Sequence, residues 1–206
     1  MIHILDYGLG NVGSISNMLR WIGCEVTVAS SPESLLGASK IIVPGVGSFD
    51  TAMGMLEKSG FREALDLKVK EERVPILGIC MGMQLFALTS EEGVARGLGY
   101  IDSHFKRFSP DHENRRLLVP HMGWSQVKIT QPHALTHGLS DEARFYFVHS
   151  YWGSCHDAEN VILTCQHGVT FAAAFASGNV MGVQFHPEKS HRFGMKLLHN
   201  FAMLTL

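Results

Sequence analysis

The sequence predicts an α/β fold in which a mainly parallel β-sheet is buried on both faces and is extended by antiparallel strands. In the first half, short apolar runs alternate with stretches of helical periodicity. That alternation is typical of parallel strands joined by crossover helices. In the second half, strand-like segments follow one another with turn residues between them, which indicates antiparallel additions to the same sheet.

The first half provides the expected parallel strands and their helices. Strands are expected where short apolar or β-branched runs occur, at 2–5, 25–29, 40–43 and 74–79. Helices are expected where apolar residues recur at helical spacing, at 12–22, 51–56, 61–72 and 81–88. Because the strands are short apolar runs separated by helices, we expect a parallel sheet that is buried on both faces.

The second half provides the expected added strands and one long helix. Strands are expected near Phe105 and at 117–119, 126–129, 144–148, 161–164, 170–175 and 180–184. A helix with one apolar face is expected at 190–204. We find no internal repeat and no linker, so the sequence predicts a single domain over residues 1–206.

Composition narrows the classes of function. The chain has 206 residues, of which 46% are hydrophobic and 17% charged, and a net charge of −2, which favours a compact fold over a disordered one. Basic residues are interspersed with acidic ones, so we expect no nucleic-acid partner. No apolar run is long enough to span a bilayer, and none at the start resembles a signal peptide. With no C-x-x-C pair, these features favour a cytoplasmic location.

The sequence predicts no metal site and no cofactor. Its twelve histidines include an i,i+4 pair, His133 and His137, but no cysteine or carboxylate completes a zinc set. Residues 8–13 (GLGNVG) match the G-x-G-x-x-G of dinucleotide-binding turns. However, the second expected strand does not end in the acidic residue that would hold a ribose. We therefore interpret these glycines as a tight first βα turn.

Residues 78–82 (GICMG) have the pattern of a nucleophile elbow with cysteine in place of serine. The two glycines allow a strand and a helix to pack closely around Cys80, whose side chain then projects from the end of the strand. The positive end of the following helix would favour its thiolate. The alternative is a buried core cysteine on a tight turn.

A nucleophilic cysteine needs a base, and His186 with Glu188 is the candidate pair. In an extended segment these residues lie on the same side, and Pro187 stiffens the backbone between them. A carboxylate beside the imidazole fixes its tautomer and favours its protonated form. The alternative is an exposed His-Pro-Glu turn after a strand.

Acyl transfer also needs donors for the oxyanion. One is the amide of Met81, which follows the nucleophile, and the other is expected in the glycine-containing loop after a neighbouring strand, at Val46. Taken alone, that loop (PGVG, residues 44–47) is an ordinary βα turn.

Together with residues 90–93 (SEEG), 119–124 (VPHMGW) and 146–151 (YFVHSY), these motifs resemble class I glutamine amidotransferases. Within that family they are similar to the glutaminase subunits of imidazole glycerol phosphate synthases. The resemblance covers nearly the whole chain and implies a three-layer, flavodoxin-like fold. It implies that Cys80 attacks the amide carbonyl of L-glutamine, that ammonia leaves, and that His186 acts as acid and base.

The resemblance also implies roles for residues other than Cys80, His186 and Glu188. Gln84, His149, Ser150 and Tyr151 would hold the amino-acid end of glutamine, and Gly47 would line its pocket. The implied partner is a (β/α)8 synthase that receives the ammonia, forms a heterodimer with this chain and makes imidazole glycerol phosphate and an aminoimidazole carboxamide ribotide. The residues expected on the side of that partner are Asn11, Met122, Trp124, Tyr146 and Lys189.

Some positions depart from the family pattern. Ser125 stands where asparagine is usual, Ser48 where alanine is common, and Trp152 is bulky beside Tyr151. Residues 190–194 (SHRFG) replace the commoner glutamine-containing run and resemble relatives that serve synthases amidinating surface-polysaccharide sugars. This partner is the alternative hypothesis. A third hypothesis, a non-catalytic binding module on the same fold, is disfavoured by the intact Cys80, His186 and Glu188.

Overall fold

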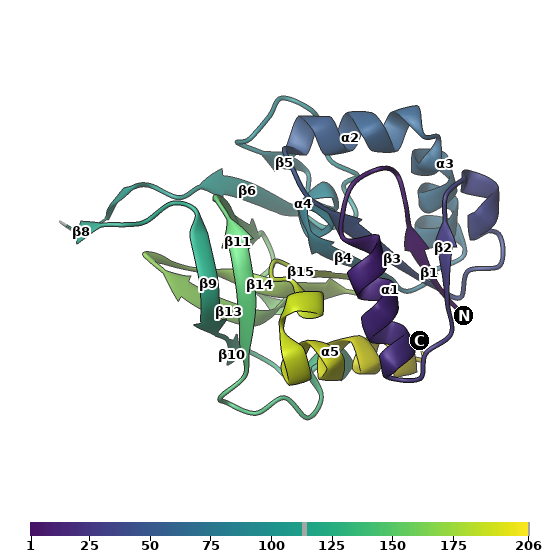
Figure 1. The fold of residues 1–206 in the computed structure, drawn as a ribbon. Helices are drawn as coiled ribbons and strands as arrows, with labels where there is room; N and C mark the ends of the chain where they lie inside the picture. Colours follow the sequence, from purple (N-terminus) through teal and green to yellow (C-terminus); the bar gives the residue numbers. More distant parts are fainter. Residues whose placement is uncertain (113–114, 206) are drawn as a thin grey trace.

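The computed structural model describes residues 1–112 and 115–205, which are built around an eight-stranded sheet in the order β10-β13-β14-β15-β4-β3-β1-β2 (Figure 1). The parallel strands are β1 (Ile2–Leu5), β2 (Val26–Ala29), β3 (Lys40–Gly45), β4 (Ile76–Cys80) and β15 (Val180–Val183). The antiparallel strands are β14 (Val169–Ser177), β13 (Val161–His167) and β10 (Lys128–Ile129). The expected mainly parallel sheet with antiparallel additions is confirmed.

Helices cover both faces of this sheet and make three layers. On one face lie α1 (Val12–Trp21) and α5 (His191–Met203), and on the other lie α2 (Phe49–Lys58), α3 (Phe61–Asp66) and α4 (Met81–Leu85) (Figure 1). Successive side chains of a strand point to opposite faces. Accordingly, Ile42 of β3 packs in the core beneath α1 and α5, whereas Ile41 and Val43 pack beneath α2 and α3. Strands β1, β3 and β4 are therefore buried on both sides, as expected, whereas β2 lies at the edge of the sheet and its Val28 is 38% exposed.

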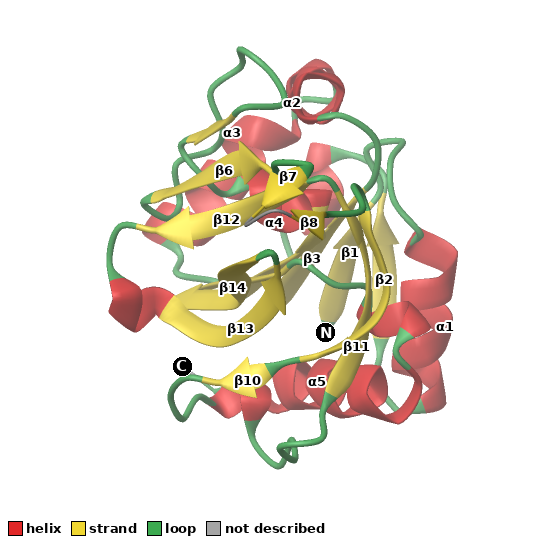
Figure 2. Cartoon of the chain, turned by 90° about the vertical axis from the view of Figure 1, so that its left-hand side faces the viewer, coloured by secondary structure: helices red, strands yellow, loops and turns green. Residues whose placement is uncertain are grey.

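Two smaller sheets extend the molecule beyond the antiparallel side. Strand β9 (His121–Gln126) pairs antiparallel with β11 (Arg144–His149). Strand β6 (Ser103–Arg107) lies between β12 (Tyr151–Cys155) and β5 (Thr89–Ser90), and Figure 2 shows β6 and β12 side by side. Strand β7 (Asp111–His112) pairs antiparallel with β8 (Arg115–Arg116).

Several expected elements differ from those observed. The strand expected at 117–119 is wrong: Leu118 is 77% exposed, and these residues connect β8 to β9 without a sheet partner. The helix expected at 81–88 ends at Leu85. The helix expected at 61–72 changes to a π-helical turn at Leu67–Glu71. No strand was expected over the bounds of β12 or β9, although the strand expected at 126–129 overlaps the last residue of β9 and includes β10.

Short 3-10 turns occur at Pro32–Leu35, Ala134–Thr136, Ala158–Asn160 and Pro187–Lys189. The last of them precedes α5 and carries part of the site described below. None of the helices in residues 1–112 and 115–205 is long and apolar enough to cross a membrane.

Candidate active site

Cys80 lies at the junction of β4 and α4 with a backbone that few residues with a side chain adopt. Its φ is +54° and its ψ is −110°. The flanking glycines make this turn possible, because a Cβ on Gly82 would collide with the Val43 carbonyl and a Cβ on Gly78 would lie 2.5 Å from the Gly82 oxygen. Strand β3 and the start of α4 thus approach each other at the backbone, and the Cys80 side chain projects from the end of β4.

The loop after β3 joins the same contact. A Cβ on Gly45 would lie 2.7 Å from the Gly82 nitrogen, so only glycine permits this approach. The contact brings Val46 and Met81, the two expected oxyanion donors, to the wall of one cavity. Gly47, with a φ of +91°, completes the turn.

His186 is buried and directly bonded to Glu188. Its Nδ1 donates to Glu188 Oε1 at 2.8 Å, because a carboxylate oxygen can only accept. This bond leaves Nε2 for Cys80. Burial works to lower the pKa of His186, but hydrogen bonds to Cys80 and Glu188 and the charges of these groups raise it to about 9. The arrangement therefore favours the protonated imidazole of His186 beside Cys80 and Glu188.

The turn that carries His186 is fixed to β11. The His186 amide donates to the Tyr146 carbonyl at 2.9 Å, and the Tyr146 amide donates to Ser190 Oγ at 3.0 Å. Ser190 Oγ in turn donates to the His186 carbonyl at 2.6 Å. These bonds hold the imidazole in place relative to β11.

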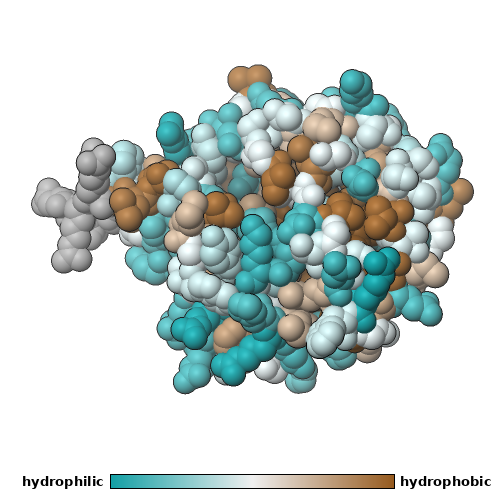
Figure 3. Space-filling model, in the orientation of Figure 1, coloured by the Kyte–Doolittle hydropathy of each residue, from teal (hydrophilic) through white to brown (hydrophobic). Residues whose placement is uncertain are grey.

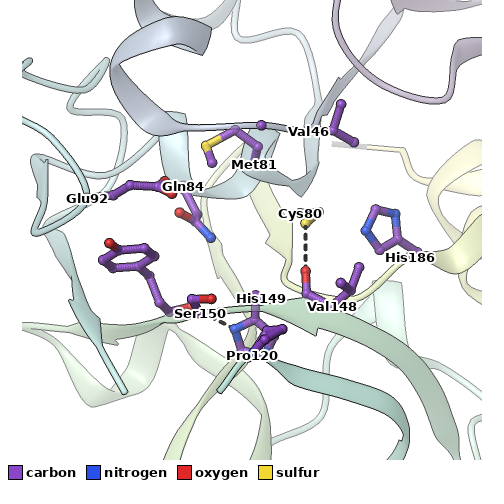
Figure 4. A pocket seen from close by; sticks show the side chains of 12 residues that line it. Val46, Cys80, Met81, Gln84, Glu92, Pro120, Val148, His149, Ser150 and His186 are labelled. Atoms are coloured by element: carbon purple, nitrogen blue, oxygen red, sulfur yellow. Dashed lines mark hydrogen bonds between the residues drawn. The ribbon is translucent and has the colours of Figure 1, made fainter. Parts of the chain in front are cut away.

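A cavity of about 320 Å³ opens above Cys80 (Figure 4). The expected site residues that line it are Val46, Gly47, Cys80, Met81, Gln84, His149, Ser150, Tyr151 and His186, and they are joined by Glu92, Pro120 and Val148. In Figure 4, His186 lies on one side of Cys80 and Gln84 on the other. Glu188 does not line the cavity but lies behind His186. The structure thus brings the expected catalytic, oxyanion and substrate-binding residues together.

Glu92 is the acidic residue of the cavity wall and was not singled out in the sequence. The Phe49 amide donates to Glu92 Oε2 at 2.9 Å and so fixes the carboxylate. Burial and the charge of Asp50 raise the pKa of Glu92, although the bond from Phe49 opposes the rise. Residues 90–93 (SEEG) contain two adjacent glutamates, and the sequence did not indicate which one faces the cavity.

His149 of the cavity wall and the buried His121 form a hydrogen-bonded chain with one proton assignment. His149 Nδ1 donates to the Tyr151 carbonyl at 2.7 Å, so its Nε2 accepts from His121 Nδ1 at 3.0 Å. His121 Nε2 then accepts from Ser125 Oγ at 2.8 Å. Burial lowers the pKa of His149 to about 3 and that of His121 to about 4, so both rings are neutral. This chain of hydrogen bonds fixes the backbone at Tyr151 and gives a structural role to Ser125.

Within residues 8–13, Gly10 is the glycine that supports the loop at residues 44–47. Gly10 has a φ of +103°, and a Cβ there would lie 2.7 Å from Pro44 Cβ. Tyr7 supports the same loop, because its hydroxyl donates to the Pro44 carbonyl at 2.9 Å. Asn11 stands immediately before α1 and is not part of the cavity wall.

Four of the residues expected on the partner side lie on or beside β9 and β11, namely Met122, Trp124, Tyr146 and Lys189, whereas Asn11 precedes α1. Trp124 and Tyr146 are cross-strand neighbours with ring centroids 6.4 Å apart, and Lys189 Nζ lies 5.7 Å from the Tyr146 ring. Trp124, which is 43% exposed, also stacks on His191 at 5.5 Å and 2°. Met122 is 62% exposed and pairs with Val148 of the cavity wall. Figure 3 shows hydrophobic residues in separate patches on this side of the molecule.

The described residues contain no group of three or more His, Cys, Asp or Glu side chains that could hold a metal ion. A family model described as "Glutamine amidotransferase class-I" matches residues 3–204. The chain belongs to the class I glutamine amidotransferases. This assignment confirms the resemblance seen in the motifs and the expected enzyme class.

This amidotransferase has full-length relatives. An imidazole glycerol phosphate synthase subunit HisH 2 from Methanococcus maripaludis is 46% identical over 201 residues, which are 98% of this chain and 98% of that protein. A protein of the same name from Pseudomonas aeruginosa is 45% identical over 205 residues and is covered completely, as is this chain.

Solved structures confirm the fold. The structure of PurLQS from Thermotoga maritima superposes with a TM-score of 0.76 at 18% identity, covering 97% of this amidotransferase and 96% of that chain. At this identity the likeness concerns the fold alone.

Proposed function

We propose that Cys80, His186 and Glu188 form a triad that hydrolyses L-glutamine to glutamate and ammonia. The observation that carries this proposal is the buried His186–Glu188 pair beside a cysteine in a strained turn, at the base of a cavity. A core cysteine or a binding module has no need of this combination, which supports catalysis over the alternatives.

In the proposed reaction, the Cys80 thiolate forms a bond from Sγ to the carboxamide carbon of glutamine. The negative charge moves to the carbonyl oxygen, where the amides of Met81 and Val46 would donate to it. The His186 imidazolium gives its Nε2 proton to the leaving nitrogen, and ammonia departs as the carbon–nitrogen bond breaks. Water then attacks the thioester with neutral His186 as base, and glutamate and the thiolate are released.

The cavity wall suits the amino-acid end of glutamine. Gln84 lines the cavity, and we propose that its side chain contacts the amino-acid end of the substrate. Glu92 can pair with the α-ammonium group, since a fixed carboxylate favours a cation. We propose that Gly47 and residues 149–151 complete the subsite for the α-carboxylate. The hydrogen bond from His149 Nδ1 to the Tyr151 carbonyl holds this segment in place.

We further propose that the chain is the glutaminase subunit of an imidazole glycerol phosphate synthase, as its relatives are named. Ammonia would pass to a (β/α)8 synthase subunit that makes imidazole glycerol phosphate and an aminoimidazole carboxamide ribotide. The proposed contact surface consists of Asn11, Met122, Trp124, Tyr146 and Lys189. The four free cysteines support a cytoplasmic location for this heterodimer.

One observation keeps a second partner in view. His191 belongs to the run at 190–194 that departs from the family pattern, and it stacks directly on Trp124 of the proposed contact surface. The alternative partner is a related synthase that amidinates a surface-polysaccharide sugar.

A covalent glutamine analogue tests the triad. We expect it to add its mass to the wild-type chain and not to Cys80→Ala, as measured by intact-protein mass spectrometry. Cys165→Ala, at a buried thiol far along the chain, is the matched control and should label normally. Labelling of Cys80→Ala at the wild-type rate would contradict the mechanism.

The partner is tested by ammonia release. We expect hydrolysis to be slow for the chain alone and faster when the histidine-pathway synthase and its nucleotide ligand are added. Stimulation by a surface-sugar synthase, with none by the histidine-pathway enzyme, would select the alternative partner.

A further inference from the structure

Gln184 lies between β15 and His186 and contacts two parts of the site at once. It is 0% exposed, and its amide donates to the Ala173 carbonyl of β14 at 2.9 Å. Its side-chain Nε2 donates to Cys80 Sγ at 3.7 Å. Its Oε1 accepts from Gln84 Nε2 at 3.2 Å. A single buried amide thus links the proposed nucleophile to a residue of the proposed substrate subsite.

We infer that Gln184 stabilises the Cys80 thiolate by donating a hydrogen bond to the sulfur and, with its other end, fixes the orientation of the Gln84 amide. The inference deepens the proposed function, because it rests on Cys80 being the nucleophile. It adds to the triad a hydrogen-bond donor that is neither an acid nor a base.

The two protonation states of Cys80 have different partners. The thiol has a proton to donate, and the Val148 carbonyl lies 4.0 Å from the sulfur in the direction of such a bond. The thiolate can only accept, and Gln184 Nε2 offers it an N–H. A hydrogen bond made to the charged form favours that form. Gln184 therefore shifts the equilibrium of Cys80 toward the nucleophile.

The same contact fixes the orientation of the Gln84 amide. Because Gln184 Oε1 accepts from Gln84 Nε2, the Gln84 amide is held with that nitrogen turned toward Gln184. Gln84 Oε1 is buried and has no hydrogen-bond partner in the described residues. Replacing Gln184 therefore removes the hydrogen bond that orients this side chain of the proposed subsite.

Other charged or titratable groups also face the sulfur, and they remain in place when Gln184 is replaced. His186 is hydrogen-bonded to Cys80, with Glu188 behind it. Tyr7, from the loop after β1, interacts with the charge of Cys80. On the other sides, His149 and Glu92 line the same cavity. A change confined to Gln184 thus isolates its own contribution.

The test is the pH dependence of Cys80 alkylation by iodoacetamide in the full chain, followed by peptide mass spectrometry. Gln184→Met removes the donor and the acceptor without adding charge. We expect its alkylation midpoint to rise by about one pH unit, so that below the midpoint Cys80 reacts about tenfold more slowly. Gln166→Met, at an exposed glutamine of β13, is the matched control and should keep the wild-type midpoint.

Gln184→Glu separates the two links. Its carboxylate still accepts from Gln84 but cannot donate to the sulfur, and its charge opposes the thiolate. We expect its alkylation midpoint to be higher than that of Gln184→Met. Its KM for glutamine should be closer to the wild-type value than the KM of Gln184→Met is, and its kcat should be reduced. A far-ultraviolet circular dichroism spectrum shows whether each variant folds; if the buried carboxylate prevents folding, Gln184→Met decides alone.

An unchanged midpoint in folded Gln184→Met would overturn the inference, whatever its glutaminase activity. If Gln184→Met raises the midpoint but the wild-type chain does not hydrolyse glutamine, the proposed function is contradicted and the donor role of Gln184 stands. The two failures are therefore distinguishable.

Discussion

At the scale of single residues, the site combines backbone strain with buried charge. The φ of Cys80 is +54°, a region that residues with a Cβ occupy at a cost of about 1–3 kcal/mol. The close contacts of Gly45, Gly78 and Gly82 hold the turn in this conformation. The strain directs the sulfur out of the sheet and toward the cavity, where His186 can reach it.

Replacing Glu188 tests the electrostatics of the base. The pKa of His186 is raised from 6.5 to about 9, so its protonated form stabilises the fold below about pH 6.5 and this contribution is lost as the pH rises through 9. Glu188→Gln keeps an acceptor for Nδ1 but removes the charge. We expect the variant to be less stable than the wild type by about 1–3 kcal/mol at pH 6.5, with the difference shrinking toward pH 10. Urea unfolding at the two pH values measures this.

The control for that experiment is Glu142→Gln, at an exposed carboxylate on the loop before β11. It should change the stability little at either pH, as is usual for surface positions. A stability difference for Glu188→Gln that stays constant from pH 6.5 to pH 10 would contradict the role assigned to His186.

The sequence indicated those site residues whose neighbours along the chain carry the signal. Cys80 lies between two glycines, and His186 lies two positions from Glu188, so local motifs indicated both. Gln184 and Glu92 had no such signal. Their contacts are with Cys80 and Phe49, 104 and 43 positions away, and only the folded chain brings these pairs together.

At the scale of elements, the first βα turn supports the loop at residues 44–47, and the glycines of this turn have unequal importance. Gly10→Ala places a Cβ against Pro44 at a positive φ, so we expect a loss of at least about 1–2 kcal/mol. A Cβ on Gly13, in α1, meets nothing within 4 Å. Gly13→Ala should therefore be neutral or stabilising by up to about 1 kcal/mol. Urea midpoints compare the two, and equal losses would refute the support role.

The sequence predicted the parallel half of the fold better than the antiparallel half. Strands such as β3 and β4 are short apolar runs between clear turn signals, and the burial of both their faces explains that pattern. Strand β12 is half-buried and contains Gly153, which weakens its pattern. At 117–119 the composition favours a strand, but Pro120 lacks an N–H and no neighbouring strand is available for pairing.

At the scale of the whole molecule, the outer face of β9 and β11 is where we expect the synthase. Trp124→Ala removes the large exposed ring of that face and its stacking on His191. We expect binding to the synthase to weaken by about 2 kcal/mol, or roughly thirtyfold in Kd, because buried aromatic anchors dominate interfaces. Titration of the synthase with the fluorescently labelled chain measures this.

Trp21→Ala is the matched control, since Trp21 is 82% exposed at the opposite end of α1 from Asn11. It should leave the Kd unchanged, and neither variant should alter the alkylation of Cys80. Equal weakening by both substitutions would place the synthase elsewhere on the molecule.

Strands β4 and β15 pair in the sheet but are far apart in the sequence, so the site can form only late in synthesis. Cys80 and Gln184 are 104 positions apart in the chain but adjacent in the sheet. A ribosome that adds about 5–20 residues per second needs roughly 5–20 s to cover that interval. Throughout this delay the cysteine is already translated, whereas its base and its hydrogen-bond donor are not. Until this interval has been translated, the nascent chain therefore holds Cys80 without the proposed base His186 and the proposed donor Gln184.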